Sequence, residues 1–116
     1  MPLRGVNKIT PFTATTVTAA GGTATSAAFS GVAAGKDLSL FLLVTGANGN
    51  IKCEILTSFD NSVFTAPETG SPIITGVTDQ LQHHAVIQVP LCIFFKLKLT
   101  NTGAADVTVG ATVLSQ

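Results

Sequence analysis

The feature that most constrains the fold is a strict alternation of apolar and polar residues near the end of the sequence. Apolar side chains take every second position from Phe95 to Leu99, and again from Val107 to Val113. A period of two places successive side chains on opposite faces of a β-strand, so one face is buried and the other is in solvent. The residues between the two runs, 101–106, are too many for a two-residue hairpin and fit a longer loop with Gly103 at a positive φ angle. This stretch therefore predicts an antiparallel pair of strands joined by that loop.

A second pair of strands is predicted around the turn residues Asn48 and Gly49. The run Leu38–Thr45 directs its even positions toward the core, and its odd positions include Phe41 and Leu43, which makes its middle apolar on both faces. Asn-Gly tolerates the positive φ angles of a tight turn, so residues 51–57 are expected to return antiparallel to 38–45 as a hairpin.

Shorter strands are predicted at 15–19, 23–29, 63–65, 73–75 and 85–89, separated by residues that favour turns. No segment has a convincing helical period of 3.6 residues. About eight strands at a spacing of roughly 8–12 residues are typical of a sandwich or barrel. The sequence therefore predicts an all-β fold, an antiparallel two-sheet β-sandwich of jelly-roll type. Residues 1–11, with two prolines and no periodicity, are expected to form an extended N-terminal arm, and residues 12–116 a single domain.

The chain has few charges, and they balance. Its 116 residues include six basic and six acidic side chains, about half the charged share usual for a soluble domain. A net charge near zero favours association. Either the chain is a small domain that tolerates this, or much of its surface is covered by other protein. Nucleic acid is not an expected partner because the basic residues are not clustered.

A membrane or secretory location is not expected either. The longest uninterrupted apolar runs, such as Leu40–Val44, are about a quarter of the roughly 20 residues that a membrane span needs. The first residues lack the apolar core of a signal peptide, so we expect the chain to be made in a cytoplasm. The two cysteines are expected to be reduced, because Cys53 has the phase of the core whereas Cys92 has the phase of Phe94 and Lys96.

Catalytic chemistry finds little support in the sequence. His83 and His84 are the only residues that resemble a metal or catalytic site, and neighbouring residues of a strand point to opposite faces. They are expected to lie in an exposed polar loop. The alternative is a zinc or nickel contact that they make, with Asp79 four residues before His83, together with symmetry-related copies around an oligomer axis. The six carboxylates are scattered, and no serine stands in a Gly-x-Ser-x-Gly turn. We therefore expect no enzyme activity, no metal and no cofactor.

The order of the strands and turns resembles a family of small β-sandwich proteins from tailed bacteriophages, the capsid decoration or cement proteins and other minor virion proteins. The matching features run from residue 38 to 114: the apolar strand Leu38–Val44, then Asn48-Gly49-Asn50, Ser58-Phe59-Asp60 followed by Phe64, and the alternating strand 95–103 that ends in Thr-Asn-Thr-Gly. Phe64 stands where the related sequences more often carry tryptophan. The resemblance implies a virion protein, with the major capsid protein and further copies of itself, as a homotrimer, for partners.

Three apolar residues lie out of phase with the core positions of their strands: Phe41, Leu43 and Phe94. Burying each is worth about 1.5–3 kcal/mol, so a patch of three binds a partner weakly unless several copies act together. Together with Arg4 and Lys8 of the arm, they are the candidate interface. Either a partner covers the three apolar residues, or the chain's own loops do.

Two alternatives to a decoration protein remain: another virion β-sandwich of the head fibre, tail or baseplate, or a carbohydrate- or receptor-binding module. The latter lacks the Trp and Tyr on which sugars usually stack.

Overall fold

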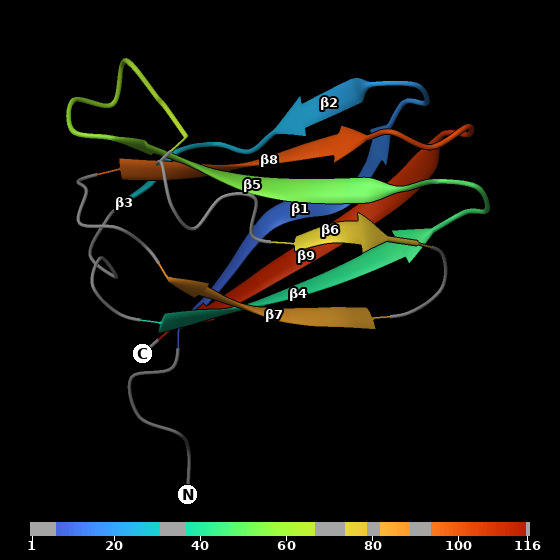
Figure 1. Cartoon of the computed structure of the whole chain (residues 1–116). Coiled ribbons are helices and arrows are strands. Elements are labelled where there is room, and N and C mark those ends of the chain that lie inside the picture. Colours follow the sequence, from blue (N-terminus) through green and yellow to red (C-terminus); the bar gives the residue numbers. More distant parts are fainter. Residues whose placement is uncertain (1–6, 31–36, 67–73, 79–81, 89–93, 116) are drawn as a thin grey trace, which may run out of the picture.

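The computed structural model describes residues 7–30, 37–66, 74–78, 82–88 and 94–115. These residues form two facing antiparallel sheets and no helix (Figure 1). In order across sheet A the strands are β1 (Asn7–Val17), β9 (Val107–Ser115), β4 (Asp37–Thr45) and β7 (Gln82–Gln88). In sheet B they are β2 (Gly22–Thr25), β8 (Phe94–Asn101), β5 (Ile51–Ser58) and β6 (Ile74–Val77), and β3 (Phe29–Ser30) follows β2 along the same edge of β8. The predicted β-sandwich is confirmed.

The strand order is that of a jelly roll. If β2 and β3 count as one interrupted edge strand, the pairs are nested: β1 pairs with β9, β2 and β3 with β8, β4 with β7, and β5 with β6. This is a long hairpin rolled up so that its successive pairs fall alternately in the two sheets, as in the double Greek key of viral capsid and lectin domains. The jelly-roll topology is therefore confirmed as well.

The two predicted hairpins are wrong, although the strands themselves are correct. β8 lies in sheet B and β9 in sheet A, and β5 lies in sheet B whereas β4 lies in sheet A. The loops 46–50 and 102–106 therefore cross from one sheet to the other instead of reversing the chain within a sheet. Alternation determines which face of a strand is buried but does not identify the neighbouring strand, and packed sheets are only about 10 Å apart, within reach of a short loop.

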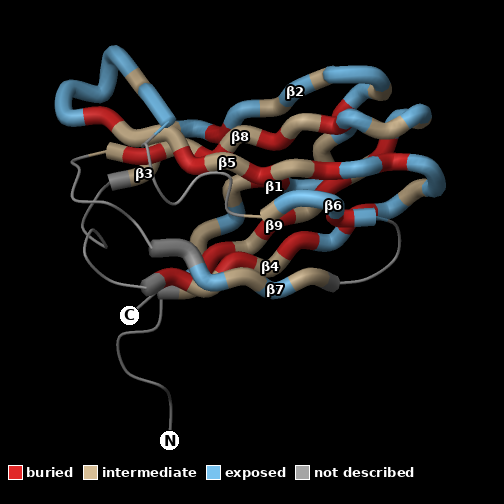
Figure 2. Tube along the Cα trace, in the orientation of Figure 1, coloured by how far each residue is buried: buried red, intermediate tan, exposed pale blue. Residues whose placement is uncertain are grey.

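The core fills the space between the sheets, where the buried residues of each strand alternate with exposed or half-buried ones (Figure 2). The even positions of β4 from Leu38 to Val44 are buried, as the sequence predicts, and so are Phe95, Leu97 and Leu99 of β8. Phe29 packs on Phe95 with ring centroids 5.7 Å apart. The short predicted strand 63–65 is reduced to a single bridge between Thr57 and Thr65.

The loops that cross between the sheets meet at one end of the sandwich, on the right in Figure 1, where buried Asn101 joins them. Its side-chain amide donates to the carbonyl oxygens of Val17 (3.1 Å) and Ala105 (2.9 Å). Its carbonyl oxygen accepts from the N–H groups of Asn50 (3.1 Å) and Gly103 (2.9 Å). One side chain thus satisfies backbone groups from the ends of three strands.

Gly103 is required for close approach and not for a positive φ angle, which it does not have. A Cβ atom at this position would lie 2.5 Å from the carbonyl oxygen of Asn48 and 2.7 Å from the nitrogen of Asn50. The positive φ angle predicted from Asn48-Gly49 in the neighbouring loop is found at Asn48, at 65°. Gly103 therefore lets the two crossing loops pack against each other.

Part of the predicted N-terminal arm, residues 1–11, is a strand: residues 7–11 belong to β1. Residues 7–9 pair with residues 113–115 of β9. Pro11 does not end the strand because the register shifts between Ile9 and Phe12, and a bulge accommodates a residue that cannot donate a ladder hydrogen bond. Residues 1–6, including Arg4, lie outside the described residues.

Candidate functional site

The two histidines lie in β7 and not in the expected polar loop. Their side chains point to opposite faces, as predicted for neighbours in a strand: His84 is exposed and stacks on Phe41, with ring centroids 4.3 Å apart and an interplanar angle of 2°. His83 is half-buried, and its Nε2 atom has no hydrogen-bond partner among the described residues. In the part of the chain that the structure describes, no group of three or more His, Cys, Asp or Glu residues is placed to hold a metal ion. Asp79 lies outside that part.

Cys53 is a free, buried thiol in the core, as its phase predicts. Burial and the neighbouring Glu54 carboxylate raise its pKa to about 12. Because the thiolate is the reactive form, this cysteine is inert near neutral pH. Cys92 lies outside the described residues.

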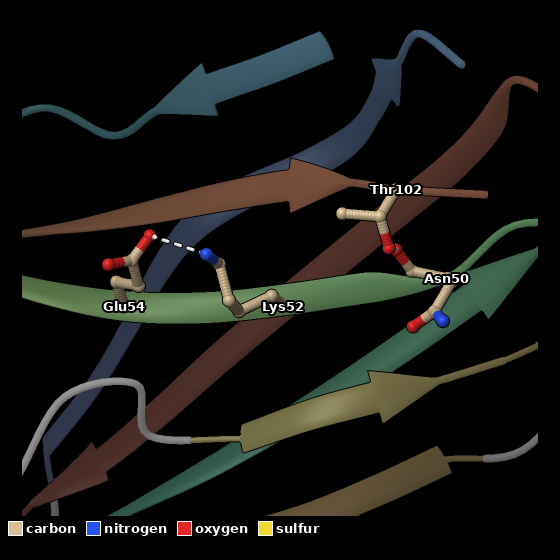
Figure 3. Close-up of polar contacts among 4 residues, drawn as sticks. All are labelled: Asn50, Lys52, Glu54 and Thr102. Carbon is tan, nitrogen blue, oxygen red and sulfur yellow. Dashed lines mark hydrogen bonds and ion pairs between the residues drawn. The ribbon is translucent and has the colours of Figure 1, made fainter. Parts of the chain in front are cut away.

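The outer face of sheet B carries its charges on the two central strands, β5 and β8. The Lys52 Nζ atom lies 3.5 Å from Glu54 Oε1, and near this ion pair Thr102 contacts Asn50, the residue just before β5 (Figure 3). The Lys96 ammonium lies 4.2 Å from the centroid of the Phe64 ring, a cation–π contact. Lys98 is directly opposite Glu54 in the register. We call this surface the charged face.

The outer face of sheet A has a different character. The only charged residues in its four strands, Lys8 and Asp37, lie at one end of the sheet. Leu43 (48% exposed) and Val86 (57% exposed) are in solvent on this face, and Phe41 and Leu114 are half-buried. We call it the uncharged face; it comprises Thr10, Ser39, Phe41, Leu43, Thr45, His84, Val86, Thr108, Gly110, Thr112 and Leu114.

The uncharged face is hollowed where β1 bulges. The register of β1 against β9 shifts twice, on either side of Phe12, and Ala14 has a φ angle of 41°. On β9, Gly110 contributes no side chain, and a Cβ atom there would meet nothing within 4 Å. The result is a hollow of about 330 Å³, which we call the groove; its lining is Thr10, Phe12, Thr13, Ala14, Phe41, Leu43, Gly110, Ala111 and Thr112. No lining residue is charged.

A second exposed apolar feature is the turn after β5, at the upper left of Figure 1. Phe59 is 78% and Val63 is 62% exposed. Their turn is held rigidly: Ser58 Oγ accepts from the N–H groups of Asp60 and Asn61, at 3.2 and 3.1 Å. The Asp60 carboxylate accepts from the N–H groups of Ser62 and Val63, at 2.9 and 3.1 Å, and from Ser58 Oγ at 2.9 Å.

These hydrogen bonds, first that from Ser62, lower the pKa of Asp60 below its ordinary value of 3.8. The carboxylate is therefore ionised at neutral pH, which is the form that accepts all three hydrogen bonds. The turn is closed at its base by two backbone hydrogen bonds between Thr57 and Thr65, of 2.8 and 3.0 Å. We call residues 58–63 the knob.

The candidate interface residues do not share one surface. Phe41, Leu43 and Lys8 lie in sheet A, whereas Phe94 is half-buried on β8 in sheet B, so the predicted patch divides between opposite sides of the molecule. Sequence reasoning missed Phe59, Val63, Val86 and Gly110 as surface features. For Phe59 a signal existed, because the self-capping turn Ser-Phe-Asp-Asn-Ser places this residue outside the strands and their buried faces.

Comparison with known proteins gives similarity at the level of the fold. No protein-family model matches the chain, and no curated protein sequence matches it. The structure of infectious bursal disease virus, Gx strain, matches with a TM-score of 0.50 and 16% identity over 94% of this chain. This chain spans 30% of that viral chain. The SPBc2 prophage-derived protein YomS matches with a TM-score of 0.50 and 14% identity over 99% of both chains.

At these identities the likeness shows the fold alone. The chain is thus a jelly-roll β-sandwich of a kind found in a viral chain and in a prophage-derived protein. No helix among the described residues is long and apolar enough to cross a bilayer.

Proposed function

We propose that the chain is a non-enzymatic structural protein of a virion, a decoration or cement protein that binds and stabilises a bacteriophage head. The observation that carries the proposal is the uncharged face of sheet A. Leu43 and Val86 expose apolar surface there, and the charged side chains of the two central strands of sheet B lie on the opposite side. A face of this kind is suited to burial against other protein, whereas the charged face is suited to solvent.

Two further observations support a virion role. The jelly roll is shared with a viral chain and with a prophage-derived protein, as described above. The net charge of zero removes the repulsion that would oppose close packing of many copies. We propose further copies of the chain, as a homotrimer, and the major capsid protein as partners. Neither nucleic acid nor a membrane is a partner in this proposal.

A cement protein gains its affinity from several contacts made at once. The apolar residues Leu43 and Val86 give a single copy only a few kcal/mol, about the amount that association alone costs. An oligomer that touches the shell through several copies makes its later contacts intramolecular, and its overall affinity rises without any new kind of contact. The proposed role is therefore to hold neighbouring shell proteins together.

The test is to replace the gene by variants in the genome that carries it and to measure the chain by mass spectrometry in the purified particles. Wild type is expected at a fixed ratio to the major capsid protein. Val86→Lys introduces a charge into the uncharged face and is expected to reduce occupancy at least tenfold. Thr25→Lys, at an exposed strand position of sheet B, is the matched control and should be retained. A wild-type chain that is absent from the particles would contradict the proposal.

A further inference from the structure

The knob and the groove are complementary features on different surfaces of the same chain. The knob projects Phe59 and Val63 from the end of sheet B, and the groove is a hollow in the outer face of sheet A. We propose that copies of this chain associate by inserting Phe59 of one copy into the groove of the next. The inference deepens the proposed function, on which it rests for the place of the assembly, by assigning the contact between copies.

The groove has the size and lining that an aromatic side chain needs. Its volume of about 330 Å³ is at the lower end of the range for pockets that bind small ligands, about 300–1,000 Å³. Its walls are Phe41, Leu43 and Ala14, and Gly110 leaves it open. An inserted phenylalanine buries about 150–250 Å² and meets only apolar or hydroxyl-bearing side chains.

Charge also favours a second copy as the occupant. The groove itself is uncharged, and the nearest described charge along β1 is exposed Lys8, two residues before Thr10. The knob carries one charge, the Asp60 carboxylate beside Phe59. A copy that places Phe59 in the groove thus brings an acidic group toward Lys8, whereas Asp37, at the same end of the sheet, is farther from the groove along its strand, four residues before Phe41. Since the chain has no net charge, no long-range repulsion opposes this approach.

Both surfaces are already ordered before they meet. Ser58 and Asp60 hold the knob through five hydrogen bonds, and the strands of sheet A form the floor of the groove. Association therefore loses little loop entropy, which is a main cost of binding. An anchor of this type is expected to dominate the contact energy, with the surrounding uncharged residues excluding water.

The contact is heterologous, because each copy offers its knob to one neighbour and its groove to another. Such contacts either close into a ring or continue as a filament. A ring of three satisfies the trimer of the proposed function. It leaves Val86, on the β7 side of the same face, available to the shell.

The first experiment is cross-linking of a mixture of two variants, each with one added cysteine, by a short bis-maleimide. Ser62→Cys on the knob mixed with Thr13→Cys in the lining of the groove should give a covalent dimer, and neither variant alone should do so; both variants keep Phe59 and Gly110. Thr25→Cys on sheet B, used in place of Thr13→Cys, is the matched control and should give none. Wild type reports any background from the native cysteines, of which Cys53 is buried. A dimer formed by Ser62→Cys alone, or equal yields with Thr25→Cys, would overturn the proposal.

The second experiment measures mass by light scattering over a concentration series. Wild type should be oligomeric, and Phe59→Ser and Gly110→Leu should each weaken association at least tenfold. Gly110→Leu fills the groove without a clash at its Cβ, so the fold is expected to survive, as circular dichroism would verify. Gly110→Ala leaves the groove largely open and should associate like wild type. An unchanged mass for both disruptive variants, or a monomeric wild type, would overturn the contact.

Failure of this contact is distinguishable from failure of the proposed function. If the Phe59→Ser and Gly110→Leu variants are both found in particles at the wild-type level, the knob contact is wrong and the proposed virion role stands. If the protein gives the expected cross-link in solution but is absent from the particles, the knob contact stands and the proposed virion role is wrong.

Discussion

At the scale of single residues, buried Asn101 supplies hydrogen-bond partners at the end of the sandwich where loops cross between the sheets. It is fully buried, and its amide contacts backbone groups of Val17, Asn50, Gly103 and Ala105. Buried backbone groups need partners, and the ends of strands that cross between sheets cannot find them within a ladder. The side chain of Asn101 supplies these partners at the point where the two sheets are joined.

Replacing Asn101 by Ala should therefore destabilise the protein severely. We expect the free energy of unfolding to fall by about 3 kcal/mol, since each buried polar group left unpaired costs about 1–3 kcal/mol. Urea denaturation at 25 °C measures the change. Asn50→Ala, an exposed side chain in the adjacent loop, is the control and should change stability by less than about 0.5 kcal/mol. Equal stability of the two variants would show that Asn101 does not hold the crossing loops.

The sequence predicts the orientation of individual side chains better than their neighbours. The phase of each strand correctly places Leu38 to Val44 and Cys53 in the core, and Phe41, Leu43 and Phe94 out of it. It does not show that Phe94 belongs to the other sheet. Alternation shows that a side chain points away from the core, but not which of the two sheets contains its strand. The role of Asn101 was likewise not predictable, since its partners come from 51 and 84 residues away or from a loop whose path depends on the topology.

At the scale of elements, the short loops decide the topology. Loops 46–50 and 102–106 cross between the sheets side by side: Thr102 N–H donates to the Asn50 carbonyl oxygen at 2.9 Å, and Ala104 N–H donates to that of Asn48 at 2.8 Å. Gly103 lies between them because no side chain fits there. These contacts fix β4 and β9 in one sheet and β5 and β8 in the other.

Gly103→Ala should therefore be much more damaging than a glycine substitution within a strand. Its Cβ would meet backbone atoms of residues 48–50 that no side-chain rotation can move away, and we expect a loss of about 2–3 kcal/mol, near the upper end for overpacking. Gly110→Ala on β9 is the matched control, with open space around its Cβ and an expected effect between zero and a gain of about 1 kcal/mol. Thermal unfolding of the two variants measures the difference. A Gly103→Ala protein as stable as Gly110→Ala would mean that the loops do not need their close packing.

The alternation of apolar and polar residues predicts where the strands lie, but it does not predict which strands pair with each other. Period-two alternation and β-branched residues give β4, β5, β8 and β9 nearly to the residue. Asn48-Gly49 and Gly103 predict hairpins that the structure does not form, because turn residues have the same chemistry in a hairpin and in a crossing loop. β7 begins earlier than predicted, since His83 and His84 read as loop residues until the register with β4 places them in the strand.

At the scale of the whole molecule, the two sheets present surfaces of opposite character. The charged face carries its ion pair and cation–π contact over the two middle strands of sheet B, and the uncharged face carries the groove and exposed apolar residues. The low overall charge predicted association, but only the fold shows where the exposed apolar residues lie: Leu43 and Val86 on the uncharged face, and Phe59 and Val63 on the knob. A protein that contacts its partners through one face and solvent through the other requires this division.

The central claim is that other protein covers the uncharged face in the assembled particle, and the accessibility of single cysteines tests it most directly. Val86→Cys and Thr25→Cys place a thiol on the outer faces of sheets A and B, and maleimide labelling is compared between free protein and purified particles, with wild type as background. We predict that both thiols react in the free protein and that only Thr25→Cys reacts in the particle. Equal labelling of Val86→Cys in the two states, or no chain in the particles at all, would contradict the account.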